Sequence, residues 1–203
     1  MYADKQIILY EYQKTRNASH PREFLKNYSG ICVTDGYQVY HTLAKEKEDL
    51  KIAGCWVHCR RKFHEALEII PKDLRKQSVL YLLMNQIRAI YREEGKLSEL
   101  VSDERLIQRQ LVVKPLVDAF FAYLKQISGR IPKSGKAREA VIYALNQERY
   151  LRVFLEDGDV PMDNNASERA IRGFCIGKKN WEMIDTINGA SSSAIIYLSL
   201  IHI

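Results

Sequence analysis

Two carboxylates occupy positions where the sequence could support metal-dependent chemistry. Asp35 follows the apolar run Gly30–Thr34, at the carboxyl end of a predicted strand, where open α/β sheets place their ligands. Alternatively, Asp35 and Gly36 form a turn, and the position in the sequence alone favours this turn over a ligand-binding role. If Asn165 caps the following helix, Glu168 occupies the third helical position and closes a capping box. The alternative for Glu168 is a metal-binding carboxylate at the start of that helix.

Two groups of basic residues indicate a phosphate partner. The first is predicted in the first turn of a helix, where each cation opposes the macrodipole at a cost of about 0.3–1 kcal/mol, and a bound phosphate would compensate this cost. Its members are His58, Arg60, Arg61 and Lys62. The second group sets an aromatic ring beside cations, which suits a sugar–phosphate backbone and a stacked base. Its members are Arg169, Arg172, Lys178, Lys179 and Trp181. A solvated charged face is the alternative for both groups.

The cysteines favour neither a disulfide scaffold nor zinc. Four cysteines in 203 residues are too few for a disulfide framework in a chain of this length. Cys55 and Cys59 flank His58, but a structural zinc site needs a second ligand pair at a matching spacing, and the sequence offers none. Cys32 lies in an apolar run and is expected to be a buried thiol.

Composition and hydropathy argue against a membrane, secreted or fibrous protein. A formal net charge of +6, a pI of about 9.1 and 46% hydrophobic residues are typical of a globular chain with a mild basic excess. No apolar run approaches the roughly 20 residues of a membrane-spanning helix. The start of the chain lacks the pattern of a signal peptide, so the cytoplasm is the expected location and no membrane partner is expected.

The elements that must position these residues follow from the apolar periodicity. Strands are predicted at residues 6–12, 30–34 and 51–57. Helices are predicted at residues 22–28, from 58 onward, at 80–91, 106–124, 141–145 and 166–171, and from 191 to the end. Residues 129–135 are expected to form a basic loop, and residues 173–181 a second loop. Two or three strands are few for so much helix.

Three motifs in order resemble the transposases of the insertion sequence 66 family. They are ThrAspGlyTyr at 34–37, GlyCysTrpValHisCysArgArgLysPhe at 54–63, and AspAsnAsnAlaSerGluArgAlaIleArg at 163–172 followed by GlyLysLysAsnTrp at 177–181. The resemblance covers residues 6 to 197 and is specific because three separate motifs agree.

The resemblance implies an α/β fold, a truncated ribonuclease H-like core with an all-α insertion. The core would comprise residues 1–63 and 158–203, with the insertion at 64–157. Asp35 would be the second catalytic and metal-binding carboxylate and Glu168 the last, holding Mg²⁺ or Mn²⁺ for cleavage and strand transfer of DNA. Arg169 and Arg172 would contact the scissile or flanking phosphates. His58 would pair with a phosphate or support the metal site.

The first catalytic aspartate of such an enzyme belongs on a strand upstream of residues 6–12. Asp4 matches no family motif, so the expectation is a fragment of a transposase that is inactive alone and a homo-oligomer when full length. One alternative is a non-catalytic DNA-binding or regulatory remnant of the same fold. A small-molecule phosphate-binding α/β protein is a third, less supported, class.

Overall fold

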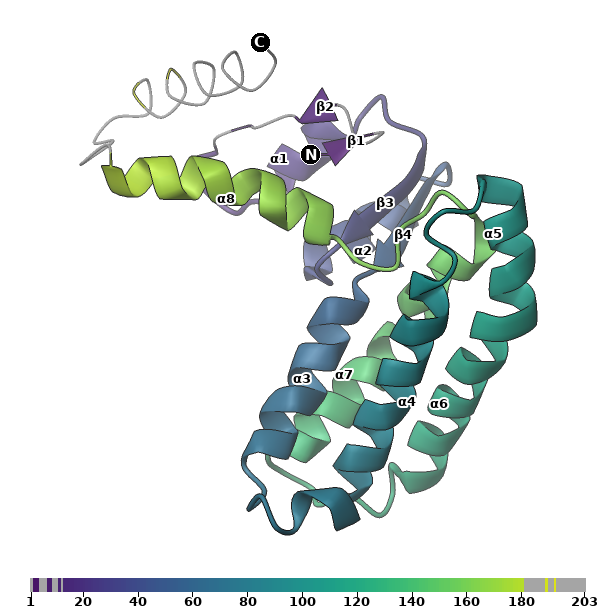
Figure 1. The fold of residues 1–203 in the computed structure, drawn as a ribbon. Helices are drawn as coiled ribbons and strands as arrows, with labels where there is room; N and C mark the ends of the chain where they lie inside the picture. Colours follow the sequence, from purple (N-terminus) through teal and green to yellow (C-terminus); the bar gives the residue numbers. More distant parts are fainter. Residues whose placement is uncertain are drawn as a thin grey trace. The chain divides into compact units, whose positions relative to one another are not determined.

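Helices and strands are mixed in the computed structural model, in agreement with the expected α/β class. It describes residues 2–3, 7–8, 11, 13–180, 189 and 192, with side chains for 11, 13–172, 189 and 192. The chain divides into two compact units, residues 1–28 with 164–203 and residues 29–163 (Figure 1). In the part of the chain that is described, no helix is both long and apolar enough to cross a membrane.

The smaller unit contains two short strands and two helices. Strands β1 (Tyr2–Ala3) and β2 (Ile7–Ile8) pair antiparallel, and β2 lies within the strand predicted at 6–12. Helix α1 (Ser19–Phe24) overlaps the helix predicted at 22–28, but it begins three residues earlier and ends four residues earlier than predicted. Its proline lies in the first turn, where a missing N–H costs nothing. Helix α8 (Asn165–Asn180) contacts β1.

The larger unit begins with a strand–helix–strand motif. Strands β3 (Gly30–Thr34) and β4 (Leu50–Gly54) pair in parallel across helix α2 (Gln38–Glu46), which the sequence analysis missed. The predicted strand at 30–34 is confirmed, whereas the one at 51–57 is shorter because a helix begins at Trp56. Most of β3 is only half-buried, since among the described residues β4 is its one neighbour in the sheet.

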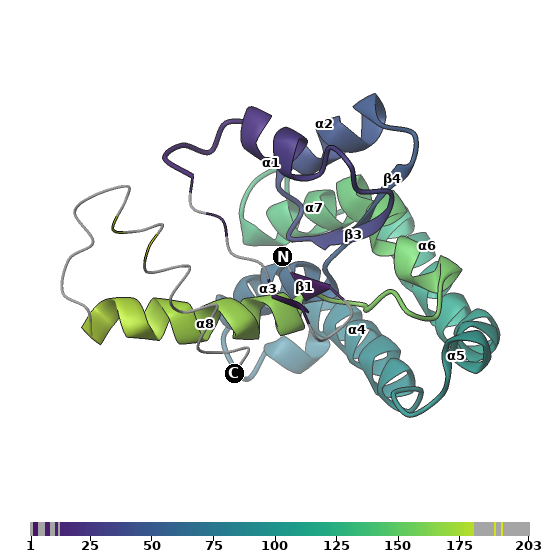
Figure 2. The same cartoon turned by 90° about the horizontal axis from the view of Figure 1, so that it is seen from above.

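Four long helices pack side by side as a bundle in this unit (Figures 1 and 2). Helices α3 (Trp56–Glu68) and α6 (Lys114–Ile127) each contact both α4 (Val79–Gly95) and α7 (Lys136–Leu151). The apolar spacing predicted α4 correctly, whereas the helix predicted at 141–145 is only the middle of the much longer α7. Aromatic rings fill the bundle core: the centroid of Trp56 lies 5.6 Å from that of Phe120 and 6.1 Å from that of Phe121, and all three side chains are fully buried.

The helix predicted at 106–124 is not one regular helix. It consists of α5 (Ser102–Gln108), a π-helical segment (Arg109–Val113) and α6. Pro115, in the first turn of α6, has no N–H to donate to the carbonyl of Leu111, so a regular α-helical ladder cannot run through this point. The wider π turn lies directly before it.

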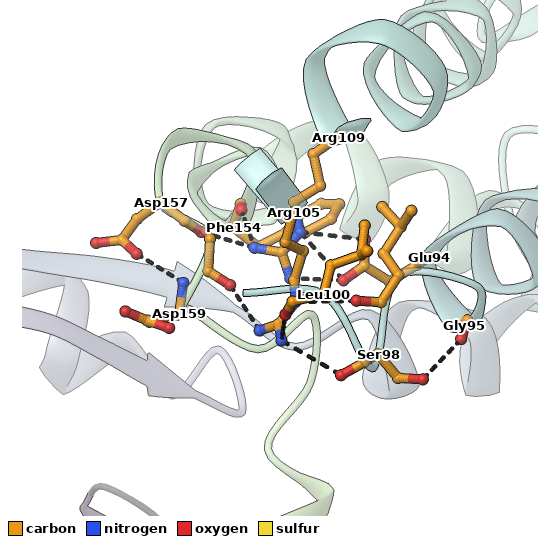
Figure 3. A network of polar contacts seen from close by, with 11 residues as sticks. Glu94, Gly95, Ser98, Leu100, Arg105, Arg109, Phe154, Asp157 and Asp159 are labelled. Atoms are coloured by element: carbon orange, nitrogen blue, oxygen red, sulfur yellow. Dashed lines mark hydrogen bonds and ion pairs between the residues drawn. The ribbon is translucent and has the colours of Figure 1, made fainter. Parts of the chain in front are cut away.

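The π segment carries a buried charge that joins three parts of the chain (Figure 3). Arg109 is 2% exposed, and its Nη2 lies 2.5 Å from Oε1 of Glu94 at the end of α4. Its Nη1 donates to the backbone oxygens of Phe154 at 2.8 Å and Asp157 at 2.6 Å. These hydrogen bonds satisfy carbonyls of the short 3₁₀ turn Val153–Glu156 and of the segment that leaves the bundle.

One helical turn before Arg109, Arg105 continues the network. Its Nη1 donates to the backbone oxygen of Gly158 at 2.9 Å, and its Nε donates to that of Leu97 at 3.1 Å. A Cβ at position 158 would lie 1.9 Å from the backbone oxygen of Ser102, so only glycine permits this approach. The path of the chain out of the bundle is therefore fixed by the hydrogen bond from Arg105 to the Gly158 carbonyl and by the close approach of Gly158 to Ser102.

Helix α7 covers one end of the β3–β4 pair (Figure 2). A Cβ on Gly54 would lie 3.2 Å from both the backbone nitrogen of Leu151 and Cβ of Tyr150, so β4 and α7 approach almost backbone to backbone. The ring of Tyr150 meets that of His41, on α2, edge-on at 3.8 Å between centroids. The last turn of α7 thus contacts both the strand and the crossover helix.

His41 is a buried titratable group in this contact, with 3% of its surface exposed. Burial lowers its pKa below the usual value, and the positive charges of Arg149 and Lys45 act in the same direction. A hydrogen bond with the Gly36 backbone and the negative charge of Asp35 oppose this change without reversing it. The imidazole is therefore neutral in the folded protein at pH 7.

We expect Arg109→Met to lower the free energy of unfolding by about 3–5 kcal/mol, because it leaves the partly buried Glu94 carboxylate and two carbonyls without their partner. Urea denaturation followed by circular dichroism measures this change. The control is Arg92→Met, since the Arg92 side chain is 71% exposed and pairs with Glu93 on the surface. Its expected effect is below about 0.5 kcal/mol. Similar losses for both variants would contradict the structural role of Arg109.

We expect the folded protein to lose stability as pH falls from 7 to 5, partly through His41. Its pKa is lower in the folded than in the unfolded chain, so its contribution is present above the unfolded value and is lost as pH falls toward the folded value. The variant His41→Phe, which keeps an aromatic ring against Tyr150, should show a shallower decline in the free energy of unfolding over this range. His64→Gln on α3 is the control, and equal slopes for wild type and His41→Phe would contradict the prediction.

Candidate active site

The parallel pairing of β3 and β4 brings the ends of both strands to one edge. Thr34 lies opposite Gly54 in the register, so Asp35 and Cys55 both follow directly at this edge. Asp35 begins the connection to α2, and Cys55 precedes the first residue of α3. This is the edge where α/β sheets bind ligands.

Asp35 has both a turn and an exposed carboxylate. Its Oδ1 accepts a hydrogen bond from the backbone N–H of Tyr37 at 3.0 Å, and Gly36 has a φ of +84°, which favours glycine. The predicted turn is therefore confirmed. Asp35 is nevertheless exposed, and Oδ2 makes no hydrogen bond within the described residues. Its role as a metal ligand stays a prediction.

Helix α7 also packs against the Asp35–Gly36 turn. A Cβ on Gly36 would lie 3.0 Å from the hydroxyl oxygen of Tyr143 and 3.5 Å from Oε1 of Gln147. Burial raises the pKa of Tyr143, and the nearby cysteine thiols and Asp35 contribute in the same direction. The turn that carries Asp35 is thus held against a helix of the bundle.

Sequence analysis did not identify the polar residues behind this turn. The buried polar atoms without a hydrogen-bond partner among the described residues include Thr34 Oγ1 on β3, His41 Nε2 on α2 and Gln147 Oε1 on α7. The three elements that carry them adjoin the Asp35–Gly36 turn. Helix α2, which carries His41, could have been predicted from the helical spacing of the apolar residues Val39, Tyr40 and Leu43.

The first basic group lies along α3, and its predicted position needs correction. Helix α3 begins at Trp56, so His58 is in the first turn whereas Arg60, Arg61 and Lys62 follow in the second. The macrodipole acts mainly within the first turn, so the predicted opposition to it does not apply to these three cations. Arg60 and Arg61 are exposed, and Lys62 and His58 are half-buried.

The segment that precedes the third motif reaches the amino end of α3. The backbone N–H of Trp56 donates to the backbone oxygen of Met162 at 3.2 Å, which brings the segment before Asp163 to the start of the helix. The guanidinium of Arg60 lies 5.8 Å from the ring centroid of Tyr91. Burial raises the pKa of Tyr91, and the charge of Asp163 raises it further. Tyr91 is a further residue of this region that sequence analysis did not single out.

The cysteines near His58 belong to the hydrophobic core. Cys55 and Cys59 are 1% and 0% exposed, Cys32 is half-buried, and all three are free thiols. Burial raises the pKa of Cys59, which keeps it protonated. Among the residues with described side chains, no group of three or more His, Cys, Asp or Glu is arranged to hold a metal ion.

Glu168 lies near the start of α8, at a different position in the helix from the one predicted. The helix begins at Asn165, and the N–H of Glu168 donates to the backbone oxygen of Asn164 at 3.0 Å as the first helical hydrogen bond. Asn164 is therefore the cap position and Glu168 the fourth helical residue, so the predicted capping box with Asn165 is wrong. Arg169 and Arg172 are exposed on the same helix.

The loop predicted at 173–181 is also wrong as far as Asn180, because α8 continues to that residue. A single glycine within a helix costs only about 1 kcal/mol, so Gly173 and Gly177 do not end it. Lys178 and Lys179 are therefore helical in backbone, while Trp181 and the helix predicted from 191 onward lie outside the described residues, apart from helical residue 192. Asp35 belongs to the larger unit and Glu168 to the smaller, and their predicted approach stays a prediction.

Curated relatives match nearly the whole chain. In Sinorhizobium fredii, the uncharacterized protein y4hP is 28% identical over 198 residues, covering 93% of this chain and 36% of the relative. The uncharacterized protein y4qI is 32% identical over 183 residues, covering 86% of this chain and 32% of its own length. The chain therefore spans about a third of the length of the relatives it matches. No solved structure matches.

The model of one protein family covers the three motifs and the elements that carry them. It is described as the Transposase IS66 family, and it matches residues 1–192. The resemblance noted in the sequence is thereby confirmed, and the chain belongs to the Transposase IS66 family.

Proposed function

We propose that this chain contributes part of the catalytic core of a DDE-type transposase, which cleaves and joins DNA with a divalent metal. Asp35 and Glu168 are the second and last metal-binding carboxylates. The observation that carries the proposal is the exposed Asp35 carboxylate at the carboxyl end of β3, in a turn supported by α7. The first aspartate of the triad is not assigned to a residue of this chain.

The order of elements supports a ribonuclease H-like core. An antiparallel strand pair and a helix precede the parallel β3–α2–β4 motif, and Glu168 lies on a helix after a long helical segment. We propose residues 1–63 and 158–203 as the core and residues 64–157 as the all-α insertion. The insertion separates Asp35 and Glu168 by 133 positions of sequence, and the folded core would bring them together.

The donor atoms suit a hard divalent cation. Carboxylate oxygens are the ligands that Mg²⁺ and Mn²⁺ prefer, and Oδ2 of Asp35 remains available after Oδ1 has accepted the turn hydrogen bond. Asp35 and Glu168 would hold the ion. When bound, the metal would activate a water or a 3′-hydroxyl and stabilise the leaving oxygen at phosphorus.

The basic residues would hold DNA around these carboxylates. Arg169 and Arg172 are exposed one helical turn apart beside Glu168, which suits contacts with neighbouring phosphates. Arg60 and Arg61 are exposed on α3. The remaining members of the proposed DNA-binding set are His58, Lys62, Lys178, Lys179 and Trp181. Transposition joins two DNA ends, so we propose that the full-length protein is a homo-oligomer.

A non-catalytic DNA-binding remnant is the second candidate function. The hydrogen bond from the Tyr37 N–H to Asp35 gives this carboxylate a structural role that needs no metal. In such a protein the basic residues would still bind DNA while Asp35 and Glu168 only shape local structure.

The test uses a protein of the relatives' full length that carries this sequence, with transposon-end DNA and Mg²⁺. We expect Asp35→Asn and Glu168→Gln each to reduce strand cleavage at least 100-fold while DNA affinity changes little. The reason is that each substitution removes one metal-binding charge without changing side-chain volume. Cleavage is measured on end-labelled DNA and affinity by fluorescence anisotropy.

The matched controls are Asp49→Asn and Glu65→Gln, two exposed carboxylates of the larger unit, which should leave cleavage within about twofold of the wild type. Unchanged cleavage in the Asp35 or Glu168 variants would refute the assignment of these residues. DNA binding without metal-dependent cleavage by the unsubstituted protein would favour the non-catalytic remnant.

A further inference from the structure

The connection between α6 and α7 lies at the end of the helical bundle that is remote from β3 and β4. Helix α3 leaves the sheet at Trp56, so its carboxyl end and the amino end of the antiparallel α7 lie at the far end (Figure 1). Residues 128–135 join α6 to α7 there. This is the basic loop identified in the sequence, and the proposed active site does not use it.

Positive charge is concentrated around this connection. The sequence has no Asp or Glu between Asp118 and Glu139. Five cations lie in the same interval: Lys125, Arg130, Lys133, Lys136 and Arg138. These 20 residues therefore carry +5, against +6 for the whole 203-residue chain. The net charge of the rest of the chain is close to zero.

Three of these five cations have partners within the bundle. Lys125 Nζ lies 2.9 Å from Oε2 of Glu148, and Lys136 Nζ lies 3.1 Å from Oε2 of Glu139. Arg138 Nη1 donates to the backbone oxygen of Ser128 at 2.8 Å. The first two pairs are surface ion pairs, whereas the third holds the start of the connection against α7.

The remaining two cations, Arg130 and Lys133, are exposed and make no side-chain hydrogen bond or ion pair with the described residues. The loop that presents them is held in place. The backbone N–H of Arg130 donates to the oxygen of Ile127 at 2.8 Å, and Ile131 packs against the hydrophobic core. These two charges therefore extend into solvent from a loop fixed at both sides.

We propose that the α6–α7 connection is a second DNA-contacting surface, in which Arg130 and Lys133 bind backbone phosphates of duplex DNA. The proposal rests on DNA being the partner, as in the proposed function, but not on catalysis. Unpaired cations on a fixed loop fit a regular array of phosphates, since each contact releases counterions. The loop exposes no aromatic or long aliphatic side chain that would insert into a membrane, which favours DNA over an anionic lipid surface.

The length of the bundle limits the spacing along its axis between this surface and the cations of α3, which begin four residues after the start of that helix. Helix α7 has 16 residues and is about 24 Å long at about 1.5 Å per residue. Duplex DNA of about seven base pairs has the same length at about 3.4 Å per pair. Contacts on α3 and on the α6–α7 connection would therefore extend the protected DNA by at most about seven base pairs.

The experiment measures binding of the 203-residue chain to a 30-base-pair duplex at several salt concentrations by fluorescence anisotropy. In a plot of the logarithm of the association constant against the logarithm of the salt concentration, we expect a negative slope. Arg130→Gln/Lys133→Gln should reduce the magnitude of this slope by about 1.8, since each lost phosphate contact removes about 0.9. The matched control is Lys96→Gln/Lys114→Gln, which also removes two positive charges but at residues paired with Glu93 and Asp118. Its slope should stay at the wild-type value.

Circular dichroism of both double variants checks that the fold is kept. An unchanged slope for Arg130→Gln/Lys133→Gln, or an equal reduction in the control, would overturn the proposal while leaving the proposed active site intact. Absence of salt-dependent DNA binding by the unsubstituted chain would overturn it as well. Unchanged cleavage in the Asp35 variant of the longer protein would overturn the proposed active site alone, so the two failures are distinguishable.

Discussion

The buried ion pair between Arg109 and Glu94 belongs to the contacts that fix how the chain leaves the helical bundle. Arg109 also donates to the carbonyls of Phe154 and Asp157, so one side chain joins the end of α4, the π segment and the segment after α7. A charge this deeply buried is tolerated only when its hydrogen-bonding capacity is satisfied. Buried hydrogen bonds of Arg109 within the bundle therefore hold the start of the segment that leads to Asp163.

The small sheet depends on the same bundle. Two parallel strands cannot bury enough apolar surface to be stable alone, and here the end of β4 lies against the backbone of α7. Trp56 adds to this packing, because its Nε1 donates to the backbone oxygen of Leu151 at 2.8 Å. The position of Asp35 consequently depends on helices that come more than 100 residues later in the chain. The helical segment proposed as an insertion is thus part of the support of the proposed site.

Sequence patterns predicted the helices with regular apolar spacing, because burial of one face repeats every three to four residues. They failed where a local feature changed this spacing. The π turn before Pro115 split one predicted helix, and the two glycines of α8 were given too much weight. Helix α2 was missed because its apolar positions are few and a buried histidine occupies one of them. The polar layer of Thr34, His41 and Gln147 depends on long-range packing that no local pattern encodes.

The turn formed by Asp35 is compatible with the proposed role of this residue as a metal ligand. One carboxylate oxygen shapes the turn, and this leaves the other directed by the same turn, so the structural role reduces the conformational freedom of the proposed metal ligand. The basic residues of α3 need a different explanation from the one predicted, since three of them lie beyond the helix turn where the macrodipole acts. The exposure of Arg60 and Arg61, and that of Arg130 and Lys133 on the α6–α7 connection, fits the proposed contacts with an extended polyanion. A single small anion at one helix end could neutralise only one of these two groups.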